Sequence, residues 1–250
     1  MTVSQDLYLS GVALTFLIAF SSLYIQLPGL YGEKGLLPAG NVIQREPQSI
    51  SEFLDQPTLL RYRYRYWLDT ESAMDVVCVS GIILSFLATV YAPMRTTLVY
   101  AILWILYMSM YSVGQTFLWF QWDILLLEAG FLAMIVAPLQ ILGLPSKHHH
   151  DNVTMWLVKW LLFRLMFASG VVKLQSHCDT WWSLTALDWH FESQCIPTPL
   201  AWYFHHTPQW FRMFSNASVF VIQIAVSFLF FAPTKTLRMF SFYAQVSIRM

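Results

Sequence analysis

Charged side chains are scarce in this 250-residue sequence, at 11% of residues against about 25% in an ordinary soluble domain. Hydrophobic residues make up 57% of the chain and aromatic residues 17%. So little charge leaves too few polar side chains to cover a water-soluble body of this size. Basic and acidic residues number fourteen each, which argues against a nucleic-acid-binding protein because such proteins carry a basic surface.

Cysteines and enzymatic signatures are also scarce. Three cysteines are too few for a disulfide-stapled secreted scaffold. The sequence contains no nucleotide-binding loop, no Gly-x-Ser-x-Gly elbow and no His-Glu-x-x-His zinc signature. We therefore expect no cofactor and no metal centre.

What the sequence does contain is a series of long hydrophobic runs. About 20 apolar residues cross the hydrocarbon core of a bilayer. The first run lacks the basic flank and small-residue cleavage site of a signal peptide, so we expect it to be retained. The sequence predicts an all-α polytopic transmembrane helical bundle with spans at about 7–27, 76–92, 98–113, 120–142, 155–174 and 217–232, and the start of another at 239–250. Because the last run is interrupted by the chain end, we expect an N-terminal part of a longer protein, with a C-terminal region missing.

Two longer polar stretches, 28–70 and 175–215, separate these runs. Basic residues occur in three short alternate connectors, at Arg95, at Lys147 and at Lys235 with Arg238. Short loops rich in Lys and Arg favour the cytoplasmic side. This predicts a cytoplasmic N-terminus and two longer loops in the opposite, lumenal compartment.

Charged residues within the predicted spans are candidates for function, because a charge at mid-bilayer is costly unless it is paired or hydrated. Glu128 in the fourth span and Arg164 in the fifth lie at similar depth. Antiparallel neighbours would let them form an intramembrane ion pair; a substrate or proton site and water-exposed positions remain alternatives. Asp123 and Lys159 lie nearer the span ends, where headgroups can hold them.

The second polar stretch contains Cys178 and Cys195, with sixteen residues between them. In an oxidising lumen a disulfide closing this loop would stabilise the fold by about 3 kcal/mol in the chain-entropy model. The stretch also contains four histidines, but none shows standard zinc-ligand spacing. We therefore predict a disulfide rather than a zinc site.

Residues 61–67 alternate arginine and tyrosine before ending in tryptophan. An extended conformation would place the arginines on one face and the tyrosines on the other, along the membrane surface. A strand that binds a partner is the alternative. Tryptophan favours the headgroup level as well, so the predicted interfacial residues are Arg61, Arg63, Arg65, Trp181 and Trp182.

Several stretches resemble the lipase maturation factor family. They are Leu-Pro-Gly-Leu-Tyr-Gly-Glu-Lys-Gly within 27–39, Gln-Trp-Asp-Ile-Leu-Leu-Leu-Glu within 114–131, Phe-Ala-Ser-Gly-Val-Val-Lys-Leu within 160–174, Thr-Ala-Leu-Asp-Trp-His-Phe-Glu within 181–202, and Phe-Ala-Pro at 231–233. The third stretch is most similar to the second member of the family. The resemblance implies a multi-pass protein of the endoplasmic reticulum membrane, not an enzyme, whose partners are membrane lipid and secretory clients such as homodimeric lipases, which it helps to fold, assemble and export.

A shorter resemblance leaves two other functions open. Residues 169–174 followed by Trp181 resemble the membrane module of vitamin K-dependent gamma-carboxylase, in which a lysine at the position of Lys173 acts in catalysis. A lysine at a span end that extends to the headgroups explains the residue equally well. The alternatives to a maturation factor are therefore a membrane enzyme using Lys173 or the cysteine pair, and a transporter using Glu128 and Arg164.

Overall fold

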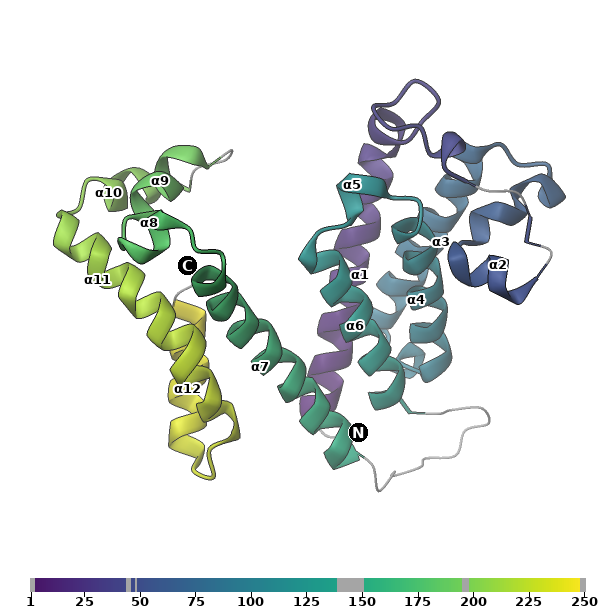
Figure 1. Cartoon of the computed structure of the whole chain (residues 1–250). Coiled ribbons are helices and arrows are strands. Elements are labelled where there is room, and N and C mark those ends of the chain that lie inside the picture. The colour runs from purple at the N-terminus through teal and green to yellow at the C-terminus, as the bar shows by residue number, and fades with distance from the viewer. Residues whose placement is uncertain (1–2, 44–45, 48, 139–150, 195–197, 248–250) are drawn as a thin grey trace. The chain divides into compact units, whose positions relative to one another are not determined.

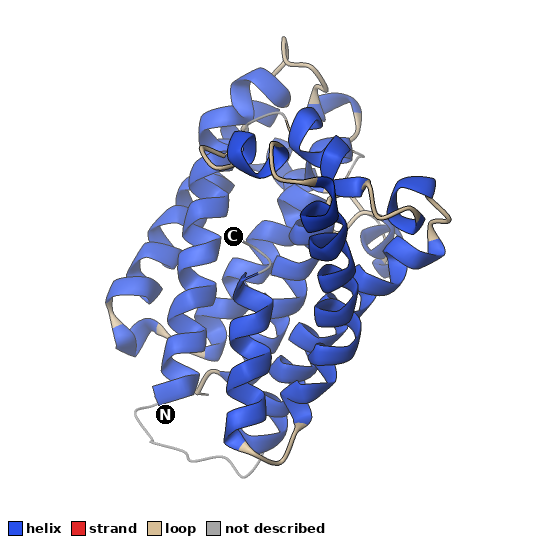
Figure 2. Cartoon of the chain, turned by 90° about the vertical axis from the view of Figure 1, so that its left-hand side faces the viewer, coloured by secondary structure: helices blue, strands red, loops and turns tan. Residues whose placement is uncertain are grey.

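The computed structural model describes residues 3–43, 46–47, 49–138, 151–194 and 198–247 (Figure 1). These residues form helices joined by loops, and no strand occurs among them (Figure 2). The predicted all-α class is therefore confirmed. The chain divides into two compact units, residues 1–157 and 158–250, and each unit is described by itself.

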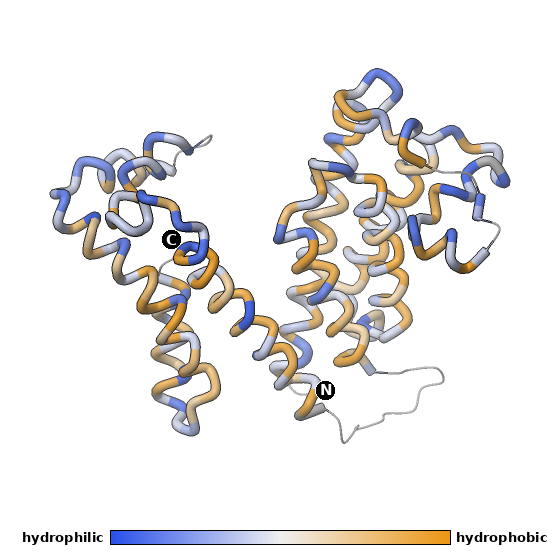
Figure 3. The backbone as a smooth tube through the Cα atoms, viewed as in Figure 1, coloured by the Kyte–Doolittle hydropathy of each residue, from blue (hydrophilic) through white to orange (hydrophobic). Residues whose placement is uncertain are grey.

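Four helical segments are long and apolar enough to cross a membrane. They are α1 (Val3–Leu30), α3 (Thr70–Val90), Val153–Gln175 within α7 (Asp151–Gln175), and Gln209–Phe231. Hydrophobic residues follow these helices along most of their length (Figure 3). Two further helices at predicted spans are shorter: α4 (Thr97–Tyr111) has 15 residues and α6 (Gln121–Val136) has 16. Residues 139–142 of the predicted fourth span lie outside the described part, and the count of six spans stays a prediction.

In the first unit, α1 packs against α3 and α6, and α4 packs against α3 and α6 (Figure 1). Phe16 and Phe20 of α1 are fully buried. Their rings face glycines: a Cβ built on Gly81 would lie 2.7 Å from the Phe20 ring, and one on Gly130 would lie 2.8 Å from Phe16 Cζ. In lipid, helices associate through such close packing at small residues.

Arg95, in the connector after α3, joins three groups at one end of this bundle. Its Nη1 donates to Asp6 Oδ1 at 2.6 Å, while Nε and Nη2 donate to the carbonyl oxygens of Ala88 and Thr89 at 2.9 and 2.7 Å. The last carbonyls of a helix lack partners within it. One buried guanidinium therefore completes the end of α3 and holds it to the first turn of α1.

The first long loop folds over the opposite end of the bundle. It contains η1 (Ala39–Asn41), α2 (Ile50–Asp55) and the 3-10 helix η2 (Leu59–Tyr66). Thr58 Oγ1 donates to Ser109 O at 2.9 Å, and Tyr31 OH donates to Gly114 O at 2.7 Å. These contacts fix the loop to the end of α4 and the turn that follows it.

The extended conformation expected for residues 61–67 is wrong, because the segment is a 3-10 helix. Arg61 is buried, and its Nη1 donates to Glu52 O at 2.6 Å. Arg63 is also buried, whereas Arg65 is exposed and lies 3.7 Å from Glu46. The arginines therefore do not share one face; Arg65 remains available for the predicted membrane surface, and the interfacial role stays a prediction.

In the second unit, the polar stretch 175–215 is also largely helical. It contains α8 (Asp179–Trp182), α9 (Ala186–Ser193), α10 (Ala201–His205) and the first half of α11 (Gln209–Phe220). We call α8, α9, α10 and the first turns of α11 the helical cap. Because α9 and α10 pack together and α9 also contacts α11, the predicted loop is a folded element.

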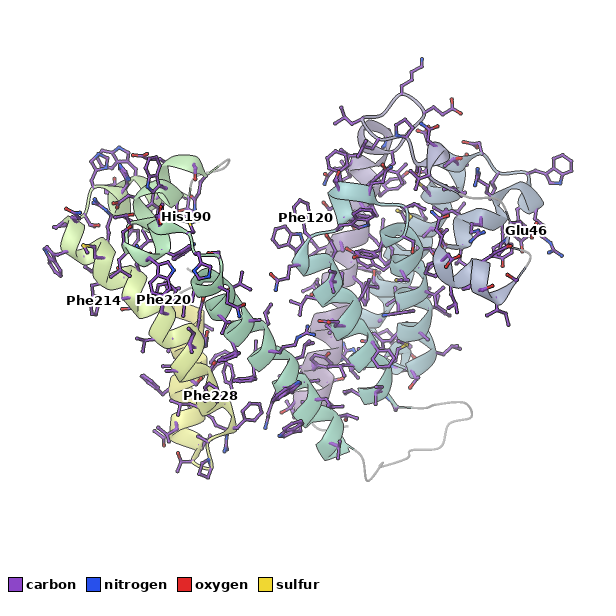
Figure 4. The ribbon with its side chains drawn as sticks, in the orientation of Figure 1. Glu46, Phe120, His190, Phe214, Phe220 and Phe228 are labelled. Carbon is purple, nitrogen blue, oxygen red and sulfur yellow. The ribbon has the colours of Figure 1, made fainter. Side chains whose placement is uncertain are left out.

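Below the cap, α11 continues as the π-helix η4 (Val221–Ala225) and the 3-10 helix η5 (Val226–Phe231), and α12 (Lys235–Ser247) packs back along both. The core here is aromatic. Phe163 of α7 lies 5.0 Å from Phe228 and 5.3 Å from Phe231 between ring centroids (Figure 4). These edge-to-face contacts hold α7 to η5.

Two glycine substitutions should have opposite effects on stability. Gly81→Ala would push a methyl group against the Phe20 ring, and overpacking of this kind costs about 1–3 kcal/mol. At Gly11, a Cβ meets nothing within 4 Å, so Gly11→Ala should leave stability unchanged or raise it through the higher helix propensity of alanine. Thermal unfolding in detergent measures both; equal effects of the two substitutions would contradict the packing described.

Candidate functional site

The π-helix η4 interrupts the candidate span Gln209–Phe231. Its sequence Val-Ile-Gln-Ile-Ala is rich in β-branched residues, which crowd a regular helix. Such bulges alter the backbone hydrogen bonding and often mark functional sites. In hydrocarbon, the carbonyls that they release need partners from the protein itself.

Polar side chains of α12 supply those partners. Gln245 Nε2 donates to Ile222 O at 2.6 Å, and Ser241 Oγ donates to Val226 O at 2.8 Å. Both side chains are buried. The polar residues of α12 therefore stabilise the irregular part of the neighbouring helix.

Lys173 of α7 joins this polar region from the other side. Its Nζ donates to Ser169 O at 2.9 Å, to Ser169 Oγ at 3.1 Å and to Gln223 Oε1 at 2.9 Å. It also lies 5.3 Å from the centroid of Trp181, within the range of a cation–π contact. The two helices approach closely here, because a Cβ on Gly170 would lie 2.7 Å from Ile224 Cγ1.

This arrangement uses the whole donor capacity of the lysine. An ammonium group has three N–H donors, and Lys173 has three acceptors within hydrogen-bonding distance. The geometry therefore favours a clamp between α7 and η4, and the catalytic role of Lys173 stays a prediction. Of the two predicted interfacial tryptophans, Trp181 packs against Phe220 and Trp182 is exposed (Figure 4 labels Phe220).

Cys178 precedes α8 in the helical cap and is exposed. Its Sγ lies 3.1 Å from Thr180 Oγ1, and hydrogen bonding with Thr180 lowers the pKa of the thiol. Cys195 lies outside the described residues, so the disulfide stays a prediction. The third cysteine, Cys78, is buried in α3.

The predicted Glu128–Arg164 pair is divided between the two units. Glu128 is half-buried on α6 in the first unit, and Arg164 is exposed on α7 in the second. The ion pair therefore stays a prediction.

The histidines of the helical cap contact different partners. His205 lies 3.5 Å from Glu192 and 5.3 Å from the His206 ring, and the His206 ring lies tilted against Trp202 at 4.2 Å between centroids. Within the described ranges, no group of three or more His, Cys, Asp or Glu side chains is arranged to hold a metal ion.

Sequence reasoning missed the ion pair that holds the cap together. Arg212 of α11 pairs with Asp188 of α9 through Nε, and its Nη1 donates to the carbonyl oxygens of His205, at 2.9 Å, and of Thr207. One arginine thus joins α9, α10 and α11. The partners lie up to 24 residues apart, and no local motif marks them.

The cap borders an open, mainly apolar cavity of about 460 Å³ that extends to Ser247 of α12. Four phenylalanines line it: Phe191, Phe204, Phe211 and Phe214. Arg212 and His190 supply polar groups to the same lining (Figure 4 labels His190 and Phe214). The outer surface of the cap is aromatic too, with exposed side chains at Trp189, Trp202, Tyr203 and Trp210. We call these four residues the aromatic surface.

The Lys173 clamp should show itself as an energetic coupling with Gln223. Lys173→Met and Gln223→Met should each reduce the free energy of unfolding by about 1 kcal/mol, and the double variant should lose little more than either single one. Lys159→Met serves as the control, because Lys159 is an exposed lysine on the same helix. Fully additive losses in a double-mutant cycle would exclude the clamp.

Cys178 should react faster than an ordinary thiol near neutral pH. Its lowered pKa gives a larger thiolate fraction at pH 7, and the thiolate is the nucleophile. In a reduced protein carrying Cys195→Ser, Thr180→Val should raise the thiol pKa and slow iodoacetamide alkylation severalfold at pH 7. Thr180→Ser keeps the hydroxyl and should preserve the rate. A rate that does not depend on the residue at 180 would contradict the hydrogen bond.

Comparison of the chain with known proteins gives matches to one family. Residues 3–250 match the lipase maturation factor transmembrane domain. The chain is 53% identical over 249 residues to lipase maturation factor 2 of Gallus gallus, covering 98% of this chain and 35% of that protein. It is 46% identical over 260 residues to lipase maturation factor 2 of Homo sapiens, covering 98% of this chain and 36% of that protein.

Lipase maturation factor 1 of Homo sapiens is more distant, at 33% identity over 236 residues, covering 92% of this chain and 41% of that protein. No solved structure matches the chain significantly. The chain spans about a third of the length of the lipase maturation factor 2 proteins that it matches. The match along almost all of its residues shows that the chain is a multi-pass membrane protein and belongs to the lipase maturation factor family.

Proposed function

We propose that the protein is an endoplasmic reticulum membrane factor that helps newly made secretory lipases to fold, assemble into homodimers and leave the compartment. The observation that carries this proposal is the match of residues 3–250 to the lipase maturation factor transmembrane domain. Because the chain spans only part of its relatives' length, their whole activity enters here as a proposal. The proposed role is one of binding and assembly rather than catalysis.

The proposed topology places the N-terminus in the cytoplasm and both long loops in the lumen. In the first unit, Asp6 and Arg95 mark one end of the bundle, and the folded loop containing α2 and η2 covers the other. A basic residue in the short connector favours the cytoplasmic side. In the second unit, Lys235 and Arg238 lie at the start of α12, after the short connector that follows η5, and the same rule supports a lumenal helical cap.

The aromatic surface of the cap is the proposed contact for client lipases. Tryptophan and tyrosine supply most of the binding energy in many protein interfaces. Trp202 and Tyr203 are 64% and 65% exposed on the short helix α10, which Arg212 holds in place. An unfolded or unassembled lipase exposes apolar surface that such side chains can contact.

The test uses the full-length protein in cells that lack the endogenous factor. Trp202→Ala combined with Tyr203→Ala should weaken lipase association about tenfold, equivalent to about 1.4 kcal/mol, and lower the specific activity of secreted lipase. Tyr91→Ala is the matched control, because Tyr91 is 57% exposed but follows α3 at the proposed cytoplasmic end. Co-precipitation with the lipase and secreted activity per lipase mass are the measurements.

Normal association and secretion in the double variant, at wild-type abundance, would exclude the aromatic surface as the client contact. If Tyr91→Ala has the same effect as the double variant, the loss reflects general destabilisation and the assignment also fails.

A further inference from the structure

A cavity of about 410 Å³ lies within the first unit. Its walls come from the second half of α1, the end of α4, the short helix α5 (Gln115–Leu118) and the start of α6. The wall along α1 includes the apolar side chains of Ile18, Ala19, Leu23 and Leu30, interspersed with the polar side chains of Thr15, Ser22 and Gln26. The part of the cavity at the start of α6 is different in character, because it contains a carboxylate.

That carboxylate belongs to Asp123, a residue that is only 7% exposed. Its Oδ1 accepts a hydrogen bond from Tyr107 OH at 2.9 Å, and its Oδ2 accepts one from the backbone N of Phe120 at 3.2 Å. Both donors are neutral. Among the described residues that line the cavity, none is a lysine, arginine or histidine.

A buried carboxylate with neutral donors alone is energetically costly, because burial removes its hydration without supplying an opposite charge. The first turn of α6 offers part of the compensation, since a helix N-terminus favours a negative charge. Each carboxylate oxygen can still accept further hydrogen bonds, and the carboxylate borders an open volume. The site therefore suits a ligand that carries positive charge.

Aromatic rings surround the same part of the cavity. Tyr31, Tyr107, Phe117, Phe120 and Trp122 all line it, and the rings of Phe120 and Trp122 stack at 4.9 Å between centroids (Figure 4 labels Phe120). Aromatic faces attract alkylammonium groups, and quaternary ammonium ligands are recognised by aromatic cages. A carboxylate beside several rings is thus the chemistry of an ammonium site.

We propose that this cavity binds the ammonium headgroup of a choline- or ethanolamine-bearing phospholipid, with hydrocarbon along the apolar side chains of α1. Two observations favour a lipid as the source of the ammonium group. The cavity is formed by α1, a candidate membrane span, and its lining includes Ile18 and Trp122, which are 62% and 66% exposed. Exposed apolar side chains on a membrane helix suit contact with lipid chains, and the cavity connects this surface to the carboxylate of Asp123.

The experiment measures which lipids the full-length protein retains. The protein is purified from membranes in a neutral maltoside detergent, and bound lipids are identified by native mass spectrometry. Wild type should retain a choline or ethanolamine phospholipid and not phosphatidylglycerol. Asp123→Asn removes the charge with little change in size and should reduce retention about tenfold. Asp69→Asn is the matched control, because Asp69 is an exposed carboxylate that caps α3.

A second variant keeps the proposal testable if Asp123→Asn fails to fold. Trp122→Leu changes an exposed ring that lines the cavity and should also lower retention of choline lipid severalfold, with thermal stability unchanged. Equal retention of phosphatidylcholine and phosphatidylglycerol would overturn the proposal, as would wild-type retention in both variants.

A titration separates the possible sources of the ammonium group. Short-chain dihexanoyl-phosphatidylcholine should displace the retained lipid from wild type, and a lysine-containing peptide without hydrocarbon should not. Displacement by the peptide at equal concentration would assign the site to a protein side chain and overturn the lipid assignment. The absence of any bound lipid after purification from native membranes would overturn the lipid assignment too.

Discussion

Backbone groups in the hydrocarbon layer of a bilayer have no water to bond with, so each one must find its partner within the protein. This constraint decides where the helices of this chain can end or become irregular. In the first unit, α3 ends where the Arg95 guanidinium donates hydrogen bonds to the carbonyl oxygens of Ala88 and Thr89 in its last turn. In the second, the π-helix η4 is possible because Gln245 and Ser241 bond to the carbonyls beside it.

The same need for partners also sets the register between helices. Tyr100 OH donates to Leu9 O at 2.7 Å, Tyr8 OH to Ala129 O at 2.9 Å and Trp104 Nε1 to Leu127 O at 2.9 Å. These bonds join α1, α4 and α6 in pairs. Together with the phenylalanine–glycine contacts of α1, they fix the relative height of the three helices, and Tyr107 and Asp123 meet as a result.

Much of the fold could be predicted from the sequence, because run length and scarcity of charge are local properties. The predicted run at 7–27 falls within α1, which extends beyond it at both ends. The run at 76–92 overlaps α3, which begins six residues earlier and ends at Val90. The alternation at 61–67 was misleading, because the segment folds as a 3-10 helix in which Arg61 is buried and donates to the carbonyl oxygen of Glu52. At the candidate site, the contact of Lys173 with Ser169 could be predicted, because the two residues are one helical turn apart. Its contact with Gln223 could not, because Gln223 is fifty residues away in the sequence.

Lys173 and Asp123, two charged residues of the helical bundle, differ in how much of their hydrogen-bonding capacity the protein itself uses. Lys173 has three N–H donors and three acceptors, with an aromatic ring beside them, so a ligand there would have to displace an existing bond. Asp123 has one neutral donor on each oxygen and borders an open cavity, so a cation there would add a bond without breaking one. Buried charge alone therefore does not identify a binding site in this membrane protein. The unused hydrogen-bonding capacity of the charge does, because it determines whether a ligand gains or loses interactions on entry.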